Sequence, residues 1–432
     1  MTDSTIFALA SGAGRAGVAV VRLSGPAAGA ALAALAGPLP PPRAAALRRL
    51  ARDGVEIDQG LVLWFPAPAS FTGEDVGELH LHGGAAVRGA LFAALSALGL
   101  KPAEPGEFSR RAVENGKLDL TRAEAIADLV DAQTEAQRRQ ALRQYDGVLA
   151  DLYEDWRARL IMALGRAEAA IDFADDGVGE AEFDAAREAA IHLAAEIKAH
   201  LDDGGRGEAL REGVRLAIIG PPNAGKSSLL NVLARRDAAI VSDIAGTTRD
   251  VIEVRLDLGG VLVIAADTAG LRESDDAIEA EGVRRALARA GEAHLTLLLL
   301  DASAAAPCAG VPADLTPDLI VWNKADLAAH DGISISLKTG AGVPALLDLL
   351  RQRVRQKFSD EAPALTPVLT RPRHRAALTE ALTTLDHAAG AAQPELLAED
   401  LRLAMRAVGR ITGRVDVEEV LDFVFRDFCI GK

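Results

Sequence analysis

The sequence predicts a multidomain protein of mixed α/β and α+β class, in which an α/β domain is inserted into a helical domain that follows an N-terminal α+β domain. Three observations support this prediction. Short β-rich runs share the first 117 residues with Ala-rich helical stretches, apolar residues then recur at helical spacing, and strands later alternate with helices. The expected ranges are 1–117 for the N-terminal domain, 118–210 and 357–432 for the two helical segments, and 211–356 for the inserted domain.

In the N-terminal range, "VAVVRL" and "ELHLH" alternate like strands, and "PGEFSRRA" begins a helix after Pro105 and Gly106. The run "GAGRAG" at 12–17 matches the dinucleotide fingerprint G-x-G-x-x-G. That fingerprint must open a helix, whereas a strand follows here, so we predict no dinucleotide site.

The helical segments carry start signals and an apolar face. Thr121 and Glu124 have the spacing of a capping box, and Asp416 with Glu419 is suited to open the last helix. Because the domain between them is an insertion, residues 118–210 are expected to pack against 372–428. The apolar face of the last helix runs into the closing pentapeptide "FCIGK", which we therefore expect to dock. A prenylation box fits that pentapeptide poorly, since it would need aliphatic residues where glycine stands.

Composition narrows the class of protein. The 432 residues are 49% hydrophobic and 25% charged, with two cysteines and a net charge of −15. Few cysteines, no apolar run near ~20 residues and no leader segment indicate a reduced, cytoplasmic protein without a membrane span. The acidic balance disfavours a general nucleic-acid coat protein.

The stretch "GPPNAGKS" at 220–227 fits the phosphate-loop pattern and stands between an apolar strand and a helix, where that mechanism requires it. Backbone N–H groups at a helix N-terminus bind phosphates. Lys226 would reach the β and γ phosphates, and the Ser227 hydroxyl would bind Mg²⁺.

Three further motifs follow in order: "GTTRD" at 246–250, "DTAG" at 267–270 and "NKAD" at 323–326. Thr248 supplies a second hydroxyl for Mg²⁺, Asp267 lies near the metal, and Gly270 can meet the γ phosphate. The Asp326 carboxylate can accept two N–H groups that guanine offers and adenine lacks, so the nucleotide is GTP. The loop "SLK" at 336–338 would close over the base.

The predicted GTP-binding residues are Asn223, Ala224, Gly225, Lys226, Ser227, Ser228, Ser242, Gly246, Thr247, Thr248, Asp267, Thr268, Ala269, Gly270, Asn323, Lys324, Asp326, Ser336, Leu337 and Lys338.

Leu271 stands after "DTAG", where small signalling GTPases place the glutamine that orients the attacking water. Leucine can neither orient nor deprotonate water, so another group is needed, and the acidic run downstream offers Glu273, Glu279 and Glu281. The side-chain oxygen of Asn223 could ligate a monovalent cation that replaces an arginine finger.

"ELHLH" also places Glu78, His80 and His82 on one face of a strand. That spacing allows a metal triad, although solvent-facing polar residues on a half-buried strand give the same pattern.

Taken together, the ordered motifs resemble one family, the tRNA modification GTPases MnmE, also called TrmE. The resemblance rests on "GRAGVAVVRLSG", "FTGEDVGELHLHGG", "PGEFSRRAVENGKLDLTRAEAIADLVDA", "GPPNAGKSSLLN", "VSDIAGTTRD", "DTAGLRES" and the closing "FCIGK". It implies a Ras-like P-loop GTPase domain and an N-terminal domain that binds 5-formyl- or 5,10-methylene-tetrahydrofolate. It also implies a homodimer, a flavoprotein partner MnmG, K⁺ activation, and addition of a carboxymethylaminomethyl-type group to carbon 5 of the wobble uridine (position 34) of certain tRNAs.

Residue by residue, the resemblance implies several site assignments. The folate contacts fall on Arg22, Glu78, Lys117 and Lys432, and the water-orienting glutamate falls on Glu279. The potassium ligands fall on Asn223, Ser242, Ile244 and Thr247.

Cys429 is either a catalytic thiolate or part of the pocket wall, and both readings stay open. A rival interpretation of the whole chain is a regulatory or ribosome-assembly GTPase that acts as a switch and performs no tRNA chemistry. Retention of a reduced folate would distinguish the two classes.

Overall fold

A computed structural model of the chain describes residues 4–173, 178–236, 238–240, 253–267, 293–309, 311–312, 315–358 and 368–415, with residues 421, 424, 425, 428, 429 and 431. The chain divides into two compact units. The first contains Met1–Ala127, Gln144–Ala190 and Thr384–Lys432, and the second contains Asp128–Arg143 and Ile191–Thr383. None of the helices within the described ranges is long and apolar enough to cross a membrane.

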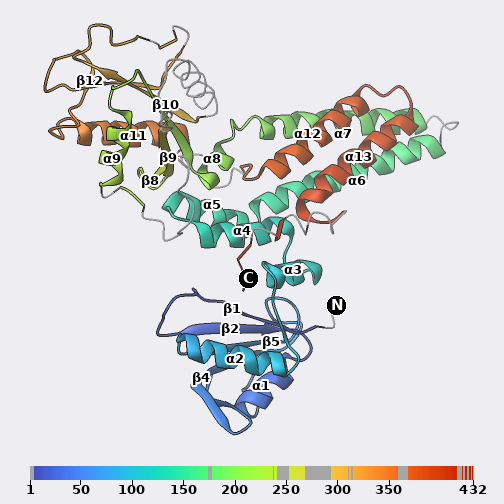
Figure 1. Ribbon diagram of the computed structural model, residues 1–432. Coiled ribbons are helices and arrows are strands. Elements are labelled where there is room, and N and C mark those ends of the chain that lie inside the picture. Colours follow the sequence, from blue (N-terminus) through green and yellow to red (C-terminus); the bar gives the residue numbers. More distant parts are fainter. Residues whose placement is uncertain are drawn as a thin grey trace, which may run out of the picture. The chain divides into compact units, whose positions relative to one another are not determined.

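The first unit contains a six-stranded sheet with the order β3-β4-β5-β2-β1-β6 (Figure 1). Its neighbouring strands are antiparallel except for β1 and β6, which are parallel. The strands are β1 (Ile6–Leu9), β2 (Ala19–Ser24), β3 (Ala46–Arg52), β4 (Val55–Phe65), β5 (Val76–Leu81) and β6 (Lys101–Pro102). The strand that follows "GAGRAG" is β2, so that glycine-rich run opens no helix.

Two helices, α1 (Ala28–Ala36) and α2 (Ala85–Ala97), cover one face of this sheet (Figure 1). Side chains alternate between the faces of a strand, and Leu23 on β2 and Leu79 on β5 are buried in the core beneath the helices. Arg22 and Glu78 are opposite each other in the β2–β5 register and point to the other face. The N-terminal sheet therefore presents a second face that α1 and α2 do not cover, and Phe108 packs there against Ile6 and Ala8.

The helical run begins with α3 (Glu107–Glu114) and α4 (Leu120–Asp131). The predicted capping box at Thr121 and Glu124 is wrong, because Asp119 caps α4. Its carboxylate accepts the Arg122 N–H at 3.0 Å and the Thr121 hydroxyl at 2.5 Å. Aspartate caps as well as threonine does, and starting the helix earlier allows Leu120 to be fully buried.

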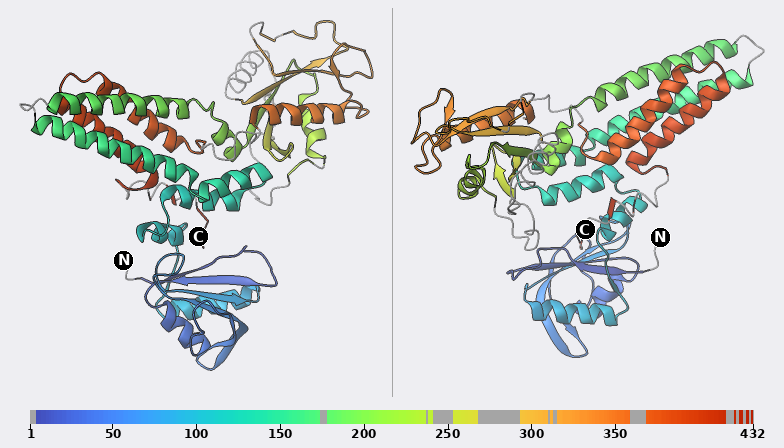
Figure 2. Two further views of the ribbon diagram at one scale, coloured as in Figure 1. Left: turned by 180° about the vertical axis from the view of Figure 1, so that it is seen from behind. Right: turned by 45° about the horizontal axis from the view of Figure 1, so that its top comes forward.

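The remaining helices of this region are α5 (Glu135–Tyr145), α6 (Val148–Asp172), α7 (Val178–Leu201), α8 (Arg206–Glu212), α12 (Pro372–Ala389) and α13 (Pro394–Thr412). The teal α6 and the red α13 run side by side (Figures 1 and 2). Ion pairs join them, from Arg402 to Glu168, and Arg414, just beyond α13, pairs with Glu154 at 3.1 Å. The helical domain is therefore built from two segments that the inserted domain separates in sequence, as predicted.

The second unit contains another six-stranded sheet with the order β12-β11-β10-β7-β9-β8. Its strands are β7 (Val214–Ile219), β8 (Glu253–Asp257), β9 (Leu262–Asp267), β10 (Leu295–Asp301), β11 (Leu319–Asn323) and β12 (Ile333–Ser334). The predicted parallel sheet is correct for five strands, while β8 is antiparallel to β9.

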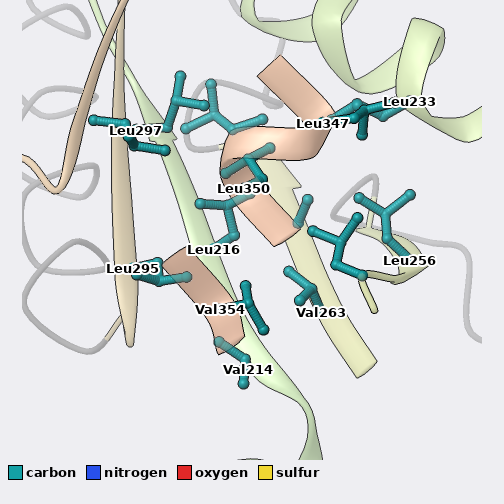
Figure 3. Packing of buried hydrophobic residues seen from close by; sticks show 14 of the residues in the cluster. Val214, Leu216, Leu233, Leu256, Val263, Leu295, Leu297, Leu347, Leu350 and Val354 are labelled. Carbon is teal, nitrogen blue, oxygen red and sulfur yellow. The ribbon is translucent and has the colours of Figure 1, made fainter. Parts of the chain in front are cut away.

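The core of this unit lies between the sheet and α11 (Val343–Phe358). Leu347, Leu350 and Val354 of α11 pack toward the strands, and Leu216 of β7 lies within the same cluster (Figure 3). Burying a leucine or valine side chain contributes roughly 1.5–3 kcal/mol, so this layer fixes the strands whose carboxyl ends carry the polar motifs.

The segments that flank the inserted domain contact each other. A Cβ atom on Gly207 would lie 2.0 Å from the carbonyl oxygen of Leu369, so only glycine fits there. Arg375 on α12 adds a second connection, because it donates to Asp203 at 2.7 Å and to the Leu201 carbonyl at 2.8 Å. The segments that enter and leave the domain are thus held together.

Candidate functional site

The predicted phosphate loop joins β7 to α9 (Lys226–Ala234). Its backbone is left-handed at Asn223 (φ 59°) and at the N-cap Gly225 (φ 101°). A Cβ atom on Gly220 would lie 2.1 Å from the Leu299 carbonyl oxygen of β10, so the loop can follow this path only with glycine there. The Lys226 ammonium donates to the carbonyl oxygens of Gly220 (2.8 Å) and Pro221 (2.9 Å), which holds its charge against the loop. This geometry suits a polyphosphate at the start of α9.

Asn323, at the end of β11, connects two parts of the nucleotide site. Its side chain is 4% exposed, and its amide donates to the Ala224 carbonyl of the phosphate loop at 2.8 Å. Its oxygen accepts the Leu337 N–H at 3.3 Å. A single amide therefore ties the phosphate loop to the loop that is predicted to cover the base.

Asp326 is held by Ser336, whose hydroxyl donates to its carboxylate at 2.6 Å. This hydrogen bond is the main reason that the pKa of Asp326 lies below its ordinary value. Asp326 is therefore ionised at neutral pH, and an ionised carboxylate can accept N–H groups on both oxygens, so the residues fit GTP.

Lys324 has a left-handed backbone (φ 64°) and pairs with Asp301 at the end of β10, with 2.5 Å between Nζ and Oδ2. Burial alone would raise the pKa of Asp301, but hydrogen bonds from Lys324 and Ser303 outweigh it and lower that pKa. Sequence reasoning missed Asp301. Its position at the carboxyl end of a strand in a parallel sheet is the unused signal by which the sequence identifies it.

For the other predicted GTP-binding residues the structure gives exposure or backbone position only. Ser227 and Ser228 are exposed in the first turn of α9, and Lys338 is exposed beside Leu337. For Asp267 the structure gives only the backbone, at the end of β9. The predicted site residues outside the described ranges are Ser242, Ile244, Gly246, Thr247, Thr248, Thr268, Ala269, Gly270, Glu279 and Lys432. Leu271, Glu273 and Glu281, which follow "DTAG", and Asp416 and Glu419, which were expected to open the last helix, also lie outside these ranges.

A second polar cluster lies on the face of the N-terminal sheet that α1 and α2 leave open. Two nitrogens of Arg22, Nε at 3.0 Å and Nη2 at 2.9 Å, bind the same oxygen of Glu78. The guanidinium also lies 5.5 Å from the ring centre of Phe71 and 5.9 Å from that of Phe108. Cation–π contacts of this kind immobilise an arginine. Sequence reasoning missed both phenylalanines, because isolated aromatic residues look like ordinary core residues.

Lys117 belongs to the chain's first unit as well. Its side chain crosses Gly73, where a Cβ atom would come within 3.0 Å of Lys117 Cε. Gly73 has a left-handed backbone (φ 79°). The glycine thus leaves room for the lysine side chain.

The three polar residues of "ELHLH" do not converge. Glu78 pairs with Arg22, whereas His82 pairs with Asp58 at 2.9 Å beyond the end of β5. Over the residues that the structure describes, no group of three His, Cys, Asp or Glu side chains is arranged to hold a metal ion.

The closing pentapeptide docks on the N-terminal part of the same unit, as predicted. The Gly106 N–H donates to the Cys429 carbonyl at 3.3 Å, and Phe428 packs against Gly106. Gly431 lies so close to Leu9 that a Cβ atom would be 2.1 Å from its carbonyl oxygen. The Cys429 residue is exposed, so docking leaves it accessible.

Two family models match the chain: the model described as GTP-binding protein TrmE N-terminus matches residues 5–117, and the MnmE helical domain model matches residues 120–429. The chain is 57% identical to the tRNA modification GTPase MnmE of Paramagnetospirillum magneticum, over 100% of both chains. It is 58% identical to the protein of that name from Parvibaculum lavamentivorans, over 99% of this chain and 100% of the relative. The chain belongs to the MnmE family of tRNA modification GTPases.

Two solved structures resemble part of this MnmE-family chain. Aquifex aeolicus Era bound to GDP·AlF4⁻ is 23% identical and covers 39% of this chain and 66% of that chain, with a TM-score of 0.26. The G domain of Thermotoga maritima FeoB is 20% identical and covers 32% and 98%, with a TM-score of 0.22. Such scores carry no functional argument, and the α/β class of the second unit rests on its own sheet order and motifs.

Proposed function

We propose that this chain binds and hydrolyses GTP with Mg²⁺ and couples that reaction to modification of tRNA. The modification adds a carboxymethylaminomethyl-type group at carbon 5 of the wobble uridine, position 34. A one-carbon unit from 5-formyl- or 5,10-methylene-tetrahydrofolate and a flavoprotein partner, MnmG, take part. Membership of the MnmE family supports GTP hydrolysis in tRNA modification. The two polar clusters support the assignment of GTP and folate to particular residues of this chain.

In the GTP-binding part of the proposal, residues of this chain bind and orient the nucleotide. Lys226 places a positive charge at the phosphate loop, and Asp326 selects guanine. Ser227 and Thr248 would hold Mg²⁺, whose chemistry is to neutralise the charge of the phosphates.

For hydrolysis, Glu279 would orient the attacking water that Leu271 cannot hold. Asn223, with Ser242, Ile244 and Thr247, would bind K⁺, which supplies positive charge near the phosphates. The support for Asn223 is its place in the phosphate loop and its exposed side chain.

For the folate half, the single observation that carries the proposal is the Arg22–Glu78 pair on the sheet face that α1 and α2 leave open. A fixed carboxylate suits the amino-pyrimidine edge of a pterin, and Lys117 with Lys432 suits the glutamate tail. The docked pentapeptide supports a role for Cys429 beside this face, either as a thiolate or as pocket wall. A Cys429→Ser variant separates these roles, since only loss of tRNA modification with unchanged GTP turnover supports the thiolate.

The proposed assembly is a cytoplasmic homodimer that works with MnmG on tRNA. In it, 1–117 binds folate and dimerises, 211–356 is the GTPase domain, and 118–210 with 357–432 forms the helical domain.

The test is calorimetric titration of 5-formyl-tetrahydrofolate into the full chain, with Arg22→Ala beside it. We expect saturable binding by the wild type and loss of about 2 kcal/mol or more of binding free energy in the variant, because a charged hydrogen-bonding group is removed. Absence of binding by the wild type would instead favour the switch-type GTPase without tRNA chemistry.

A glycine substitution tests the position of Lys117. Gly73→Ala should weaken 5-formyl-tetrahydrofolate binding about ten-fold, because the new methyl group displaces the Lys117 side chain. The matched control is Gly54→Ala: Gly54 has nearly the same φ, 80° against 79°, but nothing lies within 4 Å of its Cβ position. Equal losses in both variants would mean that backbone strain, and not Lys117, causes the effect.

A further inference from the structure

The second oxygen of Glu78 also has a partner. While Oε1 accepts from Arg22, Oε2 lies 3.3 Å from Nε2 of His80. The side chains of Glu78 and His80 are 17% and 28% exposed, so the contact is only partly open to solvent. This histidine has no part in the function proposed above.

Strand geometry brings the two side chains together. Glu78 and His80 are two residues apart on β5 and share the face that α1 and α2 leave uncovered. In the register, His80 is opposite Val20 on β2 and Leu61 on β4, both apolar. Across both neighbouring strands, therefore, apolar residues flank the imidazole, while Glu78 is a polar partner on its own strand.

The direction of the hydrogen bond follows from the chemistry of the groups. An ionised carboxylate has no proton to donate, so the bond requires a proton on Nε2 of His80. Oε2 then accepts from His80 and keeps a further lone pair for a ligand, while Oε1 accepts the Arg22 Nε–H at 3.0 Å and makes an ion-pair contact of 2.9 Å with Nη2.

Arg22 cannot fix the orientation of that carboxylate alone. Both of its nitrogens bind the same oxygen, Oε1, so the carboxylate could still rotate about that contact. The bond from His80 to Oε2 removes this freedom. Planar recognition of two parallel N–H groups requires both carboxylate oxygens at fixed positions.

We infer that His80 is a positioning residue that fixes the Glu78 carboxylate for a 2-amino-pyrimidinone edge, the edge that a reduced folate presents. The inference rests on the proposed folate site and assigns selectivity for that edge to the Arg22–Glu78–His80 cluster.

The experiment titrates two ligands by calorimetry into the full chain: 5-formyl-tetrahydrofolate and its analogue with a methyl group in place of the 2-amino group. His80→Leu should weaken binding of the natural ligand about ten-fold but leave the analogue within about two-fold, because the analogue cannot use both carboxylate oxygens. His80→Gln should stay within about three-fold of the wild type, since its amide nitrogen can donate at a similar reach.

His82→Leu is the matched control, because His82 pairs with Asp58 and not with Glu78. It should bind both ligands like the wild type, and thermal unfolding checks that every variant is folded. Equal weakening of both ligands by His80→Leu, or no weakening of either, would overturn the inference while the folate site stands. If the wild type binds neither ligand, the folate proposal itself fails and this inference fails with it.

Discussion

Asp326→Asn is expected to lower the affinity for GTP at least 100-fold, the largest effect that we predict. The carboxylate can accept two N–H groups of guanine, whereas an asparagine can accept only one and places its NH₂ against the other. Losing charge-assisted hydrogen bonds and adding this mismatch costs about 3–4 kcal/mol. Fluorescence titration with a labelled GTP analogue measures it.

The same variant should gain affinity for xanthosine triphosphate. Its base carries a carbonyl where guanine has the amino group, so the asparagine NH₂ can donate to it. The variant should therefore prefer xanthosine triphosphate to GTP. Ser336→Ala, which removes only the hydroxyl that holds Asp326 at 2.6 Å, should weaken GTP binding to a smaller degree. Unchanged GTP affinity in Asp326→Asn would remove this residue from the base site.

Asn223→Gly is expected to abolish activation by potassium. In the wild type, GTP turnover in KCl should exceed that in NaCl by at least about ten-fold, and in the variant the ratio should approach one. A preorganised positive charge near the phosphates contributes on the order of 100-fold to such reactions. Phosphate release at equal ionic strength in the two salts measures the ratio.

Glycine is the right replacement because Asn223 has φ 59°. Alanine there would add backbone strain of about 1–2 kcal/mol, which would confuse loss of the side chain with damage to the loop. GTP affinity should therefore stay within about three-fold in Asn223→Gly. Equal turnover of the wild type in both salts would refute the role of Asn223 in binding a cation.

The sequence could predict features that depend on residues close together in the chain. The phosphate loop is recognisable because its glycine, lysine and serine must stand at fixed spacing between a strand and a helix, whatever surrounds them. The alternation of "ELHLH" likewise placed Glu78 and His80 on one face, as β5 has them. The Asp119 cap was missed because two residues that cap well stand close together, and burial of Leu120 decided between them.

Contacts between distant segments were out of reach. Asn323 and Ala224 are separated by 99 positions, and nothing in either motif says that they share a hydrogen bond. Phe108 on α3 meets Arg22 on β2 only because the fold brings α3 to the sheet face that α1 and α2 leave open. Such partners depend on how elements pack, which periodicity does not record.

The contact between Gly207 and Leu369 has a consequence for how the chain folds. Closing a flexible loop of about 160 residues costs roughly 4–5 kcal/mol in entropy, from (3/2)RT ln n. Because Gly207 and Leu369, on the segments that flank the inserted domain, contact each other, the loop between them is already closed when α6 and α13 pair. The intervening domain then shortens the effective length of flexible chain between α6 and α13. The two helices can therefore pair as if they were close in sequence.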